Sequence, residues 1–99
     1  MTLDFHPAVQ RDFNEAINYY EERGGRHLAD RFETEFRVCV EAIKAAPTSF
    51  APHGTAAMFR RIRLASFPYV MLYRQLPDVL RVVLLKHERR HPLYGTGRR

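Results

Sequence analysis

Residues 58–86 read MFRRIRLASFPYVMLYRQLPDVLRVVLLK, and this stretch decides the fold. Apolar and polar side chains alternate along much of it, and β-branched and aromatic residues are frequent, as is typical of β-strands. We predict three strands, at residues 59–64, 69–75 and 79–86, and the last is an almost unbroken apolar run that suits a buried central strand. Because the intervening turns are short and contain proline, the strands should form consecutive antiparallel hairpins.

The residues before this stretch predict a short strand and two helices. An extended start at residues 2–5 leads to a helix that begins near Pro7, where the fixed φ and the missing N–H of proline cost nothing. Apolar residues then recur at helical spacing as far as the pair Gly24-Gly25, which breaks the pattern. A second apolar helical face covers residues 28–43, and residues 47–57 are predicted to be a connecting loop.

This order of elements predicts an α+β fold. An N-terminal strand, a helical hairpin and a three-stranded antiparallel meander should form a small sheet that the two helices cover on one face. We expect the other face to be open and the tail, residues 90–99, to lack a long regular element. A chain of 99 residues matches one domain, residues 1–99, since single domains typically have about 100–150 residues.

Several classes of protein are disfavoured by composition. No apolar run approaches the roughly 20 residues that cross a bilayer, and the start MTLDFHPAVQ has no basic segment followed by an apolar one. We therefore expect a cytoplasmic protein that has no membrane partner. Cys39 is the single cysteine, so an internal disulfide and a cysteine-based zinc site are both excluded, and a reducing compartment fits.

Charge is divided unevenly along the chain. Residues 60–99 carry ten basic side chains, nine of them arginine, against two acidic ones, whereas residues 1–59 carry six basic and nine acidic side chains. The formal charge is therefore −3 for residues 1–59 and +8 for residues 60–99. Such a field attracts polyanions, and the planar guanidinium binds phosphate through two donors at once. The alternative is a basic surface that only keeps the protein in solution.

Two arginines of the first predicted meander strand should share one face. Residues two apart on a strand project to the same side, so Arg61 and Arg63 point one way while Ile62 and Leu64 point the other. The apolar pair should meet the helices, which directs the arginines to the uncovered side, where a phosphate backbone could lie. The alternative is a pair of solvated cations on an exposed strand.

The segment KHERRHPLY, residues 86–94, gathers titratable groups directly after the predicted central strand. His87 or His91 could act as a general base, Arg89 and Arg90 could stabilise a pentavalent phosphate, and Tyr94 could stack on a base or donate a proton. The reaction would be RNA cleavage through attack of the 2′-hydroxyl.

The same segment has a purely structural interpretation. His87 would then cap the strand, Tyr94 would pin the tail to the sheet, and the arginines would pair with Glu88 or with a partner's carboxylate. A metal site is disfavoured, because Pro92 follows His91 directly and opposes the helix that two histidines four residues apart would need. We expect neither a metal nor another cofactor.

The run RIRLASFPYVMLYR at residues 61–74, followed by HERRHPLY at residues 87–94, resembles the RelE/ParE superfamily of type II toxins. The likeness covers almost the whole chain and is stronger to the ParE-like members. It includes Tyr19-Tyr20-Glu21 and the end of the second predicted helix, residues 43–47.

The resemblance implies one of two activities. RelE-like toxins cut messenger RNA in the ribosomal A site without a metal ion, whereas ParE-like toxins inhibit DNA gyrase and have no established nuclease site. In both groups the toxin arrests growth, and ParE-like members are associated with plasmid stabilisation. A short antitoxin wraps and silences the toxin, so the resemblance also implies a cognate antitoxin and a toxin–antitoxin hetero-oligomer.

Carried over residue by residue, the resemblance is incomplete. Arg61 and Arg63 match a pair of basic residues on the RelE-type strand, Arg90 matches a late arginine, and Tyr94 matches a terminal catalytic tyrosine. Val70 stands where a RelE-type toxin has a cation, unless Arg74 or Arg81 replaces it. The predicted catalytic residues are therefore Arg61, Arg63, His87, Arg90 and Tyr94, and those predicted to bind nucleic acid or another target are Arg60, Arg74, Arg81, Lys86, Arg89 and Arg98.

Overall fold

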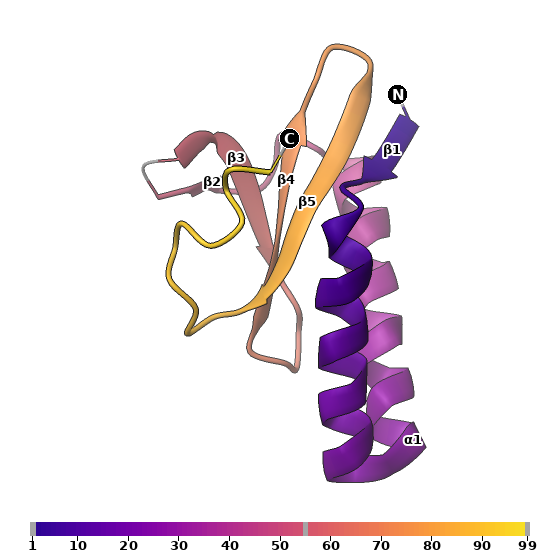
Figure 1. Ribbon diagram of the computed structural model, residues 1–99. Helices are drawn as coiled ribbons and strands as arrows, with labels where there is room; N and C mark the ends of the chain where they lie inside the picture. The colour runs from indigo at the N-terminus through magenta and orange to yellow at the C-terminus, as the bar shows by residue number, and fades with distance from the viewer. Residues whose placement is uncertain (1, 55, 99) are drawn as a thin grey trace.

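The computed structural model describes residues 2–54 and 56–98, so Thr55 of the predicted loop and Arg99 of the predicted tail lie outside it. Figure 1 shows a helical hairpin packed beside a twisted sheet. The elements are β1 (Thr2–Phe5), α1 (Ala8–Ala45), β2 (Pro52–His53), β3 (Ala56–Arg63), β4 (Tyr69–Gln75) and β5 (Val79–His87).

Element α1 consists of two antiparallel arms that meet at Gly25 (Figure 1). Gly25 has a φ of 75° and a ψ of −169°, a conformation that breaks the helix and that glycine adopts without steric cost. Pro7 is the N-cap residue, and the apolar stripes of the arms meet through Phe13, which lies 4.9 Å from Phe36 and 6.2 Å from Phe32 between ring centroids. The predicted hairpin is therefore confirmed. No helix within the described part of the chain has the length and apolar character needed to cross a membrane.

The sheet has the strand order β1-β5-β4-β3-β2. Strands β3, β4 and β5 form the predicted antiparallel meander. Strand β1 adds in parallel to β5, with Thr2 opposite Val79 and Phe5 opposite Val82. This parallel pair requires a long crossover, which the helical hairpin provides. The predicted α+β class is confirmed, and the apolar β5 lies inside the sheet.

One part of the secondary-structure prediction is wrong. Residues 47–57 are not entirely a loop, because they contain β2 and the first residues of β3, which begins at Ala56 rather than at residue 59. The chain reverses at Gly54, whose φ is 50°, and His53 then lies opposite Ala56 in an antiparallel pair. Within the described residues the sheet therefore has five strands, whereas the sequence predicted four.

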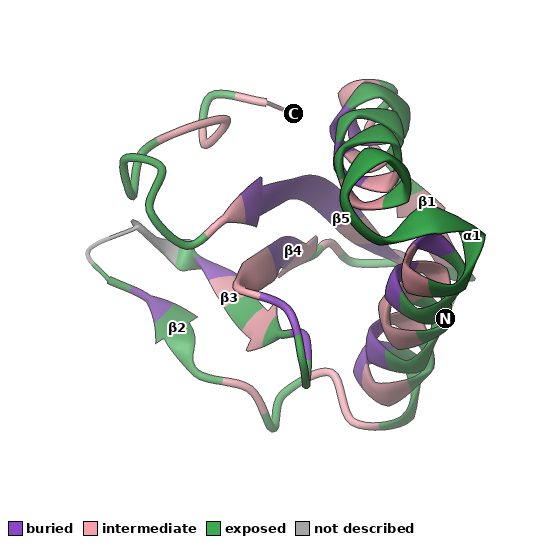
Figure 2. Ribbon diagram, turned by 90° about the horizontal axis from the view of Figure 1, so that it is seen from below, coloured by how far each residue is buried: buried purple, intermediate pink, exposed green. Residues whose placement is uncertain are grey.

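The helical hairpin covers one face of the sheet, and the main core lies between these two layers (Figure 2). Tyr73 is completely buried there, and its hydroxyl donates to the backbone carbonyl of Pro47 over 2.5 Å. Other side chains of this core that are fully buried are Phe32, Ile43, Leu64, Met71 and Val82.

The opposite face of the sheet is covered in part by the tail, residues 88–98 (Figure 2). Gly95 approaches the sheet so closely that a β-carbon there would lie 2.7 Å from the Cδ2 atom of Leu84. A second, smaller apolar cluster lies on this side and consists of Phe59, Leu72, Val83 and Leu84. The face that we expect to be open is thus partly closed by the protein's own C-terminal segment.

Candidate functional site

A row of side chains crosses the sheet on the face away from the helices. Arg63 of β3 lies opposite Val70 of β4, and Val70 lies opposite Lys86 of β5. Arg61 lies opposite Leu72, a member of the smaller apolar cluster, and therefore shares this face two residues further along β3. The strand alternation thus places both arginines on the side where they were expected.

A groove of about 780 Å³ lies beside this row. Strand β3, the chain around β2, the end of β5 and the tail all contribute to it. Four side chains from the predicted set line it together, and these are Arg61, Arg63, Lys86 and Arg90. We call this cavity the basic groove.

Lys86 is the most deeply buried cation of the basic groove, with an exposed fraction of 4%. Its Nζ atom donates to the backbone carbonyl of His91 over 3.0 Å. Burial lowers the pKa of Lys86 from its ordinary value, and the positive charge of Arg61 lowers it further. The sheet thus holds like charges near one another, which makes the groove electropositive.

Arg63 has two partners in the groove. Its Nη1 atom donates to the carbonyl of Leu64 over 2.9 Å, and its Nε atom forms an ion pair with the Glu88 carboxylate. Glu88 is held in place through its own backbone, whose N–H donates to the carbonyl of Pro68 over 2.8 Å. Within residues 2–54 and 56–98, Glu88 is the single acidic residue that lines the groove.

His53 also lines the groove, although it is not among the site residues predicted from the sequence. It is 6% exposed, and its Nε2 atom lies 2.8 Å from the carbonyl oxygen of Pro92. Because a carbonyl oxygen only accepts, Nε2 carries the hydrogen, and the buried Nδ1 atom has no hydrogen-bond partner in the described structure. A histidine between a proline and a glycine in a predicted loop was the only signal in the sequence.

Tyr94 and Arg98 lie outside the basic groove, because their side chains are directed to Asp12 of α1. The Tyr94 hydroxyl lies 3.4 Å from one carboxylate oxygen of Asp12, and Arg98 binds both oxygens, at 2.6 and 3.2 Å. The carboxylate raises the pKa of Arg98, mainly through this hydrogen bond. Arg90 connects the two regions, since it lines the groove and its guanidinium carbon lies 4.6 Å from the Tyr94 ring centroid.

His87 and Arg60 face the helical side of the sheet. The His87 ring contacts that of Tyr69, with 5.4 Å between centroids, and its Nδ1 atom accepts from the backbone N–H of Arg89 over 3.1 Å. The Arg89 side chain is exposed. Arg60 donates to the carbonyl of Phe50 over 2.7 Å. These three predicted residues therefore lie apart from the row at Val70.

Arg74 and Arg81 do not replace the cation missing at Val70. They lie opposite each other on β4 and β5, four residues along β4 from Val70, which corresponds to roughly 13 Å. Arg81 also binds Asp4 through two contacts of 2.8 and 3.1 Å. The suggestion that either arginine takes this place is thus wrong, and the cation in the same row as Val70 is Lys86.

Comparison with known proteins identifies the family. The family model of the ParE toxin of the type II toxin–antitoxin system parDE matches residues 3–92. The chain belongs to the ParE toxin family. Toxin ParE2 of Mycobacterium tuberculosis (strain CDC 1551 / Oshkosh) is 26% identical over 90 residues, which cover 91% of this chain and 84% of that protein. The Toxin ParE2 sequence of strain H37Rv gives the same values.

A solved structure supports the same fold. The structure of the chromosomal ParDE system from P. aeruginosa has a TM-score of 0.78 and 14% sequence identity, and the match covers 88% of this chain and 95% of that one. The resemblance to the RelE/ParE superfamily, and to its ParE-like members in particular, is confirmed. The residues matched by the ParE family model, 3–92, include all four cations of the basic groove and end before Tyr94 and Arg98.

The chemistry available in the groove of this ParE-family protein is chiefly anion binding. Four cations surround one carboxylate, whereas the Tyr94 hydroxyl points to Asp12 and His87 lies on the other face. Among the residues that the structure describes, no three histidine, cysteine, aspartate or glutamate side chains lie together as metal ligands. The four cations of the groove suit it to binding an anion such as a phosphate.

Proposed function

We propose that this ParE-family toxin arrests bacterial growth by inhibiting DNA gyrase in the cytoplasm and that its cognate antitoxin silences it. The observation that carries the choice of target is the row in which Val70 lies between Arg63 and Lys86. The basic groove lacks the cation of a RelE-type toxin at that position, and the Tyr94 hydroxyl is turned toward Asp12. A binding activity is therefore favoured over cleavage, and the family resemblance names gyrase as the target.

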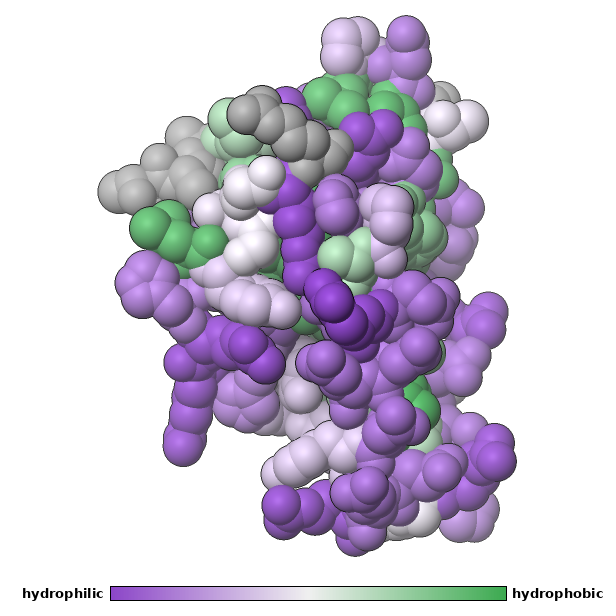
Figure 3. Space-filling view, in the orientation of Figure 1, coloured by the Kyte–Doolittle hydropathy of each residue, from purple (hydrophilic) through white to green (hydrophobic). Residues whose placement is uncertain are grey.

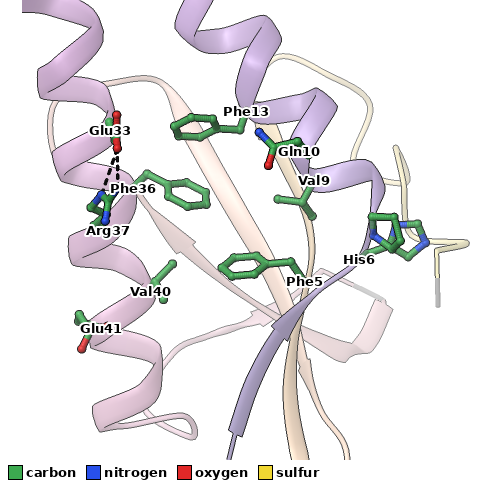
Figure 4. Close-up of a pocket in the computed structure, with 11 residues that line it drawn as sticks. Phe5, His6, Val9, Gln10, Phe13, Glu33, Phe36, Arg37, Val40 and Glu41 are labelled. Atoms are coloured by element: carbon green, nitrogen blue, oxygen red, sulfur yellow. Dashed lines mark hydrogen bonds and ion pairs between the residues drawn. The ribbon is translucent and has the colours of Figure 1, made fainter.

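An apolar groove supports the proposed antitoxin complex. It measures about 680 Å³ and lies between the two arms of α1 and the end of β1, with Phe5, Phe36 and Val40 among its apolar residues (Figure 4). Phe5 is 43% exposed, and the ion pair of Glu33 and Arg37 lies at the side of the groove. An exposed apolar groove of this kind suits an apolar segment of a partner protein.

The surface around the hairpin contrasts with this groove. Hydrophilic side chains cover most of the hairpin in the view of Figure 3, and the hairpin carries ion pairs away from the groove, such as that of Arg26 and Glu21. The apolar groove is thus a local departure from a charged surface. We propose that the antitoxin covers it in a toxin–antitoxin hetero-oligomer.

Growth and two biochemical assays test the proposal. Expression of the chain should stop growth, and coexpression of the product of the adjacent gene should restore it. Purified protein should block supercoiling by gyrase and leave ribosome-bound messages intact. Unaffected growth on expression, together with no binding of the adjacent gene product, would contradict the proposed toxin activity. Unimpaired supercoiling would contradict the choice of gyrase.

A ribosome-dependent mRNA endoribonuclease is the second candidate function. The grouping of Arg61, Arg63 and Arg90 with Lys86 around one groove favours it, because such a cradle can hold a scissile phosphate. In that case the protein should cut messages on the ribosome, and Arg63→Ala should lower the rate by one to several powers of ten. A non-catalytic nucleic-acid-binding module would instead show salt-sensitive binding and neither activity.

A further inference from the structure

Glu88 introduces a negative charge into an otherwise cationic groove. It is the first residue after β5, and its backbone N–H is fixed to the turn between β3 and β4 through the carbonyl of Pro68. Its carboxylate binds the Nε atom of Arg63, while Arg63 remains anchored through Nη1 to the carbonyl of Leu64. The guanidinium is therefore held in position for an anion, and a side chain of the protein itself supplies that anion.

The charges around this ion pair do not balance. Arg61, Lys86 and Arg90 line the same groove as Arg63, and Glu88 is the one carboxylate that faces these four cations in the described part of the chain. Arg61 also lowers the pKa of Lys86, because these two positive charges repel each other. A polyanion that places several charged groups along the groove would relieve this repulsion better than the single carboxylate of Glu88 does.

The ion pair is also accessible and replaceable. The Arg63 side chain is 52% exposed and the Glu88 side chain 38% exposed, so water screens their attraction. Exposed pairs of this kind contribute little to folding. An incoming anion can therefore displace the carboxylate without disturbing the sheet.

We propose that Glu88 is a built-in competitor for the anion site of the basic groove, and that a phosphodiester group of a nucleic acid displaces its carboxylate from Arg63. A nucleic acid is favoured over an acidic protein because a guanidinium group can stack on a base as well as bind a phosphate, and three arginines share the groove. The inference rests on the proposed function, in which the basic groove serves binding and not cleavage, and it names a phosphodiester as the group that the groove binds. Glu88 thereby limits the affinity of the groove for nucleic acid and also limits how strongly that affinity depends on salt.

Binding to a labelled single-stranded oligonucleotide, measured by fluorescence anisotropy at low and at raised salt, tests the proposal. Glu88→Gln should lower the Kd about three- to tenfold at low salt, and the gain should shrink as salt rises. Glu41→Gln is the matched control, since it removes the same charge from an exposed residue of α1 outside the groove. It should change the Kd by less than about twofold. Thermal unfolding should show that both variants are folded.

A double-mutant cycle tests whether Glu88 acts through Arg63. In an Arg63→Gln background, Glu88→Gln should raise the affinity for the oligonucleotide no more than Glu41→Gln does. An equal gain from Glu88→Gln and Glu41→Gln would overturn the proposal, as would a gain that persists without Arg63. Displacement of the oligonucleotide by polyglutamate at equal charge concentration would overturn the choice of phosphate. If the wild-type protein and Glu88→Gln both fail to bind while expression still stops growth, this inference fails and the proposed toxin activity stands.

Discussion

Replacing Arg98 with methionine should destabilise the fold strongly, because the change leaves the Asp12 carboxylate buried without its cation. The Asp12 side chain is 3% exposed and that of Arg98 is 13% exposed. Asp12 accepts the backbone N–H of Leu85 over 3.1 Å, and Arg98 donates to the carbonyl of Val83 over 3.0 Å. Both side chains thus bind backbone groups of β5 beyond Val82, the last residue that pairs with β1.

The size of the effect follows from these contacts. Removing one partner of a buried ion pair typically costs about 3–5 kcal/mol. Two contacts of Asp12 survive the change, the 3.1 Å bond from Leu85 and the 3.4 Å contact with Tyr94, so we expect about 3 kcal/mol. For a domain of this size 1 kcal/mol corresponds to about 4–8 °C, which predicts a Tm lower by at least about 12 °C.

Urea unfolding followed by circular dichroism at neutral pH measures this loss. Arg89→Met is the matched control, because Arg89 lies exposed on the same tail, and it should change the free energy of unfolding by less than about 0.5 kcal/mol. Asp12→Asn in the Arg98→Met background removes the uncompensated charge and should recover part of the stability. A loss below about 1 kcal/mol for Arg98→Met, or a double variant no more stable than the single one, would refute the reasoning.

Three further predictions concern groups outside the groove. Burial, and secondarily the charge of Glu35, raises the pKa of Cys39 from 9.0 to about 11, so at pH 8 alkylation by iodoacetamide should be about a hundredfold slower than after unfolding in urea. The hydrogen bond from Arg81 lowers the pKa of Asp4 below its ordinary value of 3.8. The ion pair of Asp4 and Arg81 therefore stabilises the fold above pH 3.8, and this contribution is lost as the pH falls through the lowered pKa of Asp4. Asp4→Asn should therefore cost less than about 1 kcal/mol at pH 7 and reduce the dependence of urea unfolding on pH below about 4. Gly25→Ala should cost about 1–3 kcal/mol in urea unfolding, because a φ of 75° with a ψ of −169° is a conformation that essentially only glycine adopts, whereas Gly97→Ala, in open space, should be nearly neutral.

The main elements of the fold could be predicted from the sequence because their signals are local. Helical spacing of apolar residues and the glycine pair at 24–25 determined the hairpin, and alternation determined the meander. Strand β2 could not be found in this way, since two residues carry no periodicity and Pro52 opposes a strand assignment. It forms because the chain reverses at Gly54 and pairs with β3.

The candidate site was only partly predictable, for a related reason. Alternation along β3 placed Arg61 and Arg63 on one face, but the alignment of Val70 with Lys86 depends on the register between two strands. The sequence also gave no means of choosing between a catalytic and a structural role for Tyr94. In the structure its hydroxyl lies near Asp12, 82 positions earlier in the chain. Such a contact depends on how the tail crosses the sheet.

The basic half of the chain therefore has two physically distinct groups of cations. Arg60, Arg81 and Arg98 lie outside the basic groove, where Arg60 binds the loop before β2, Arg81 binds β1 and Arg98 binds α1. Two of the three are neutralised by aspartates from residues 1–59, so part of the charge difference between the halves cancels across the fold. Among the residues that the structure describes, the four cations of the basic groove face one carboxylate, that of Glu88, so their charge is less fully cancelled. The arginine count alone thus overstates the surface available to a polyanion, whereas the strand register shows where that surface is.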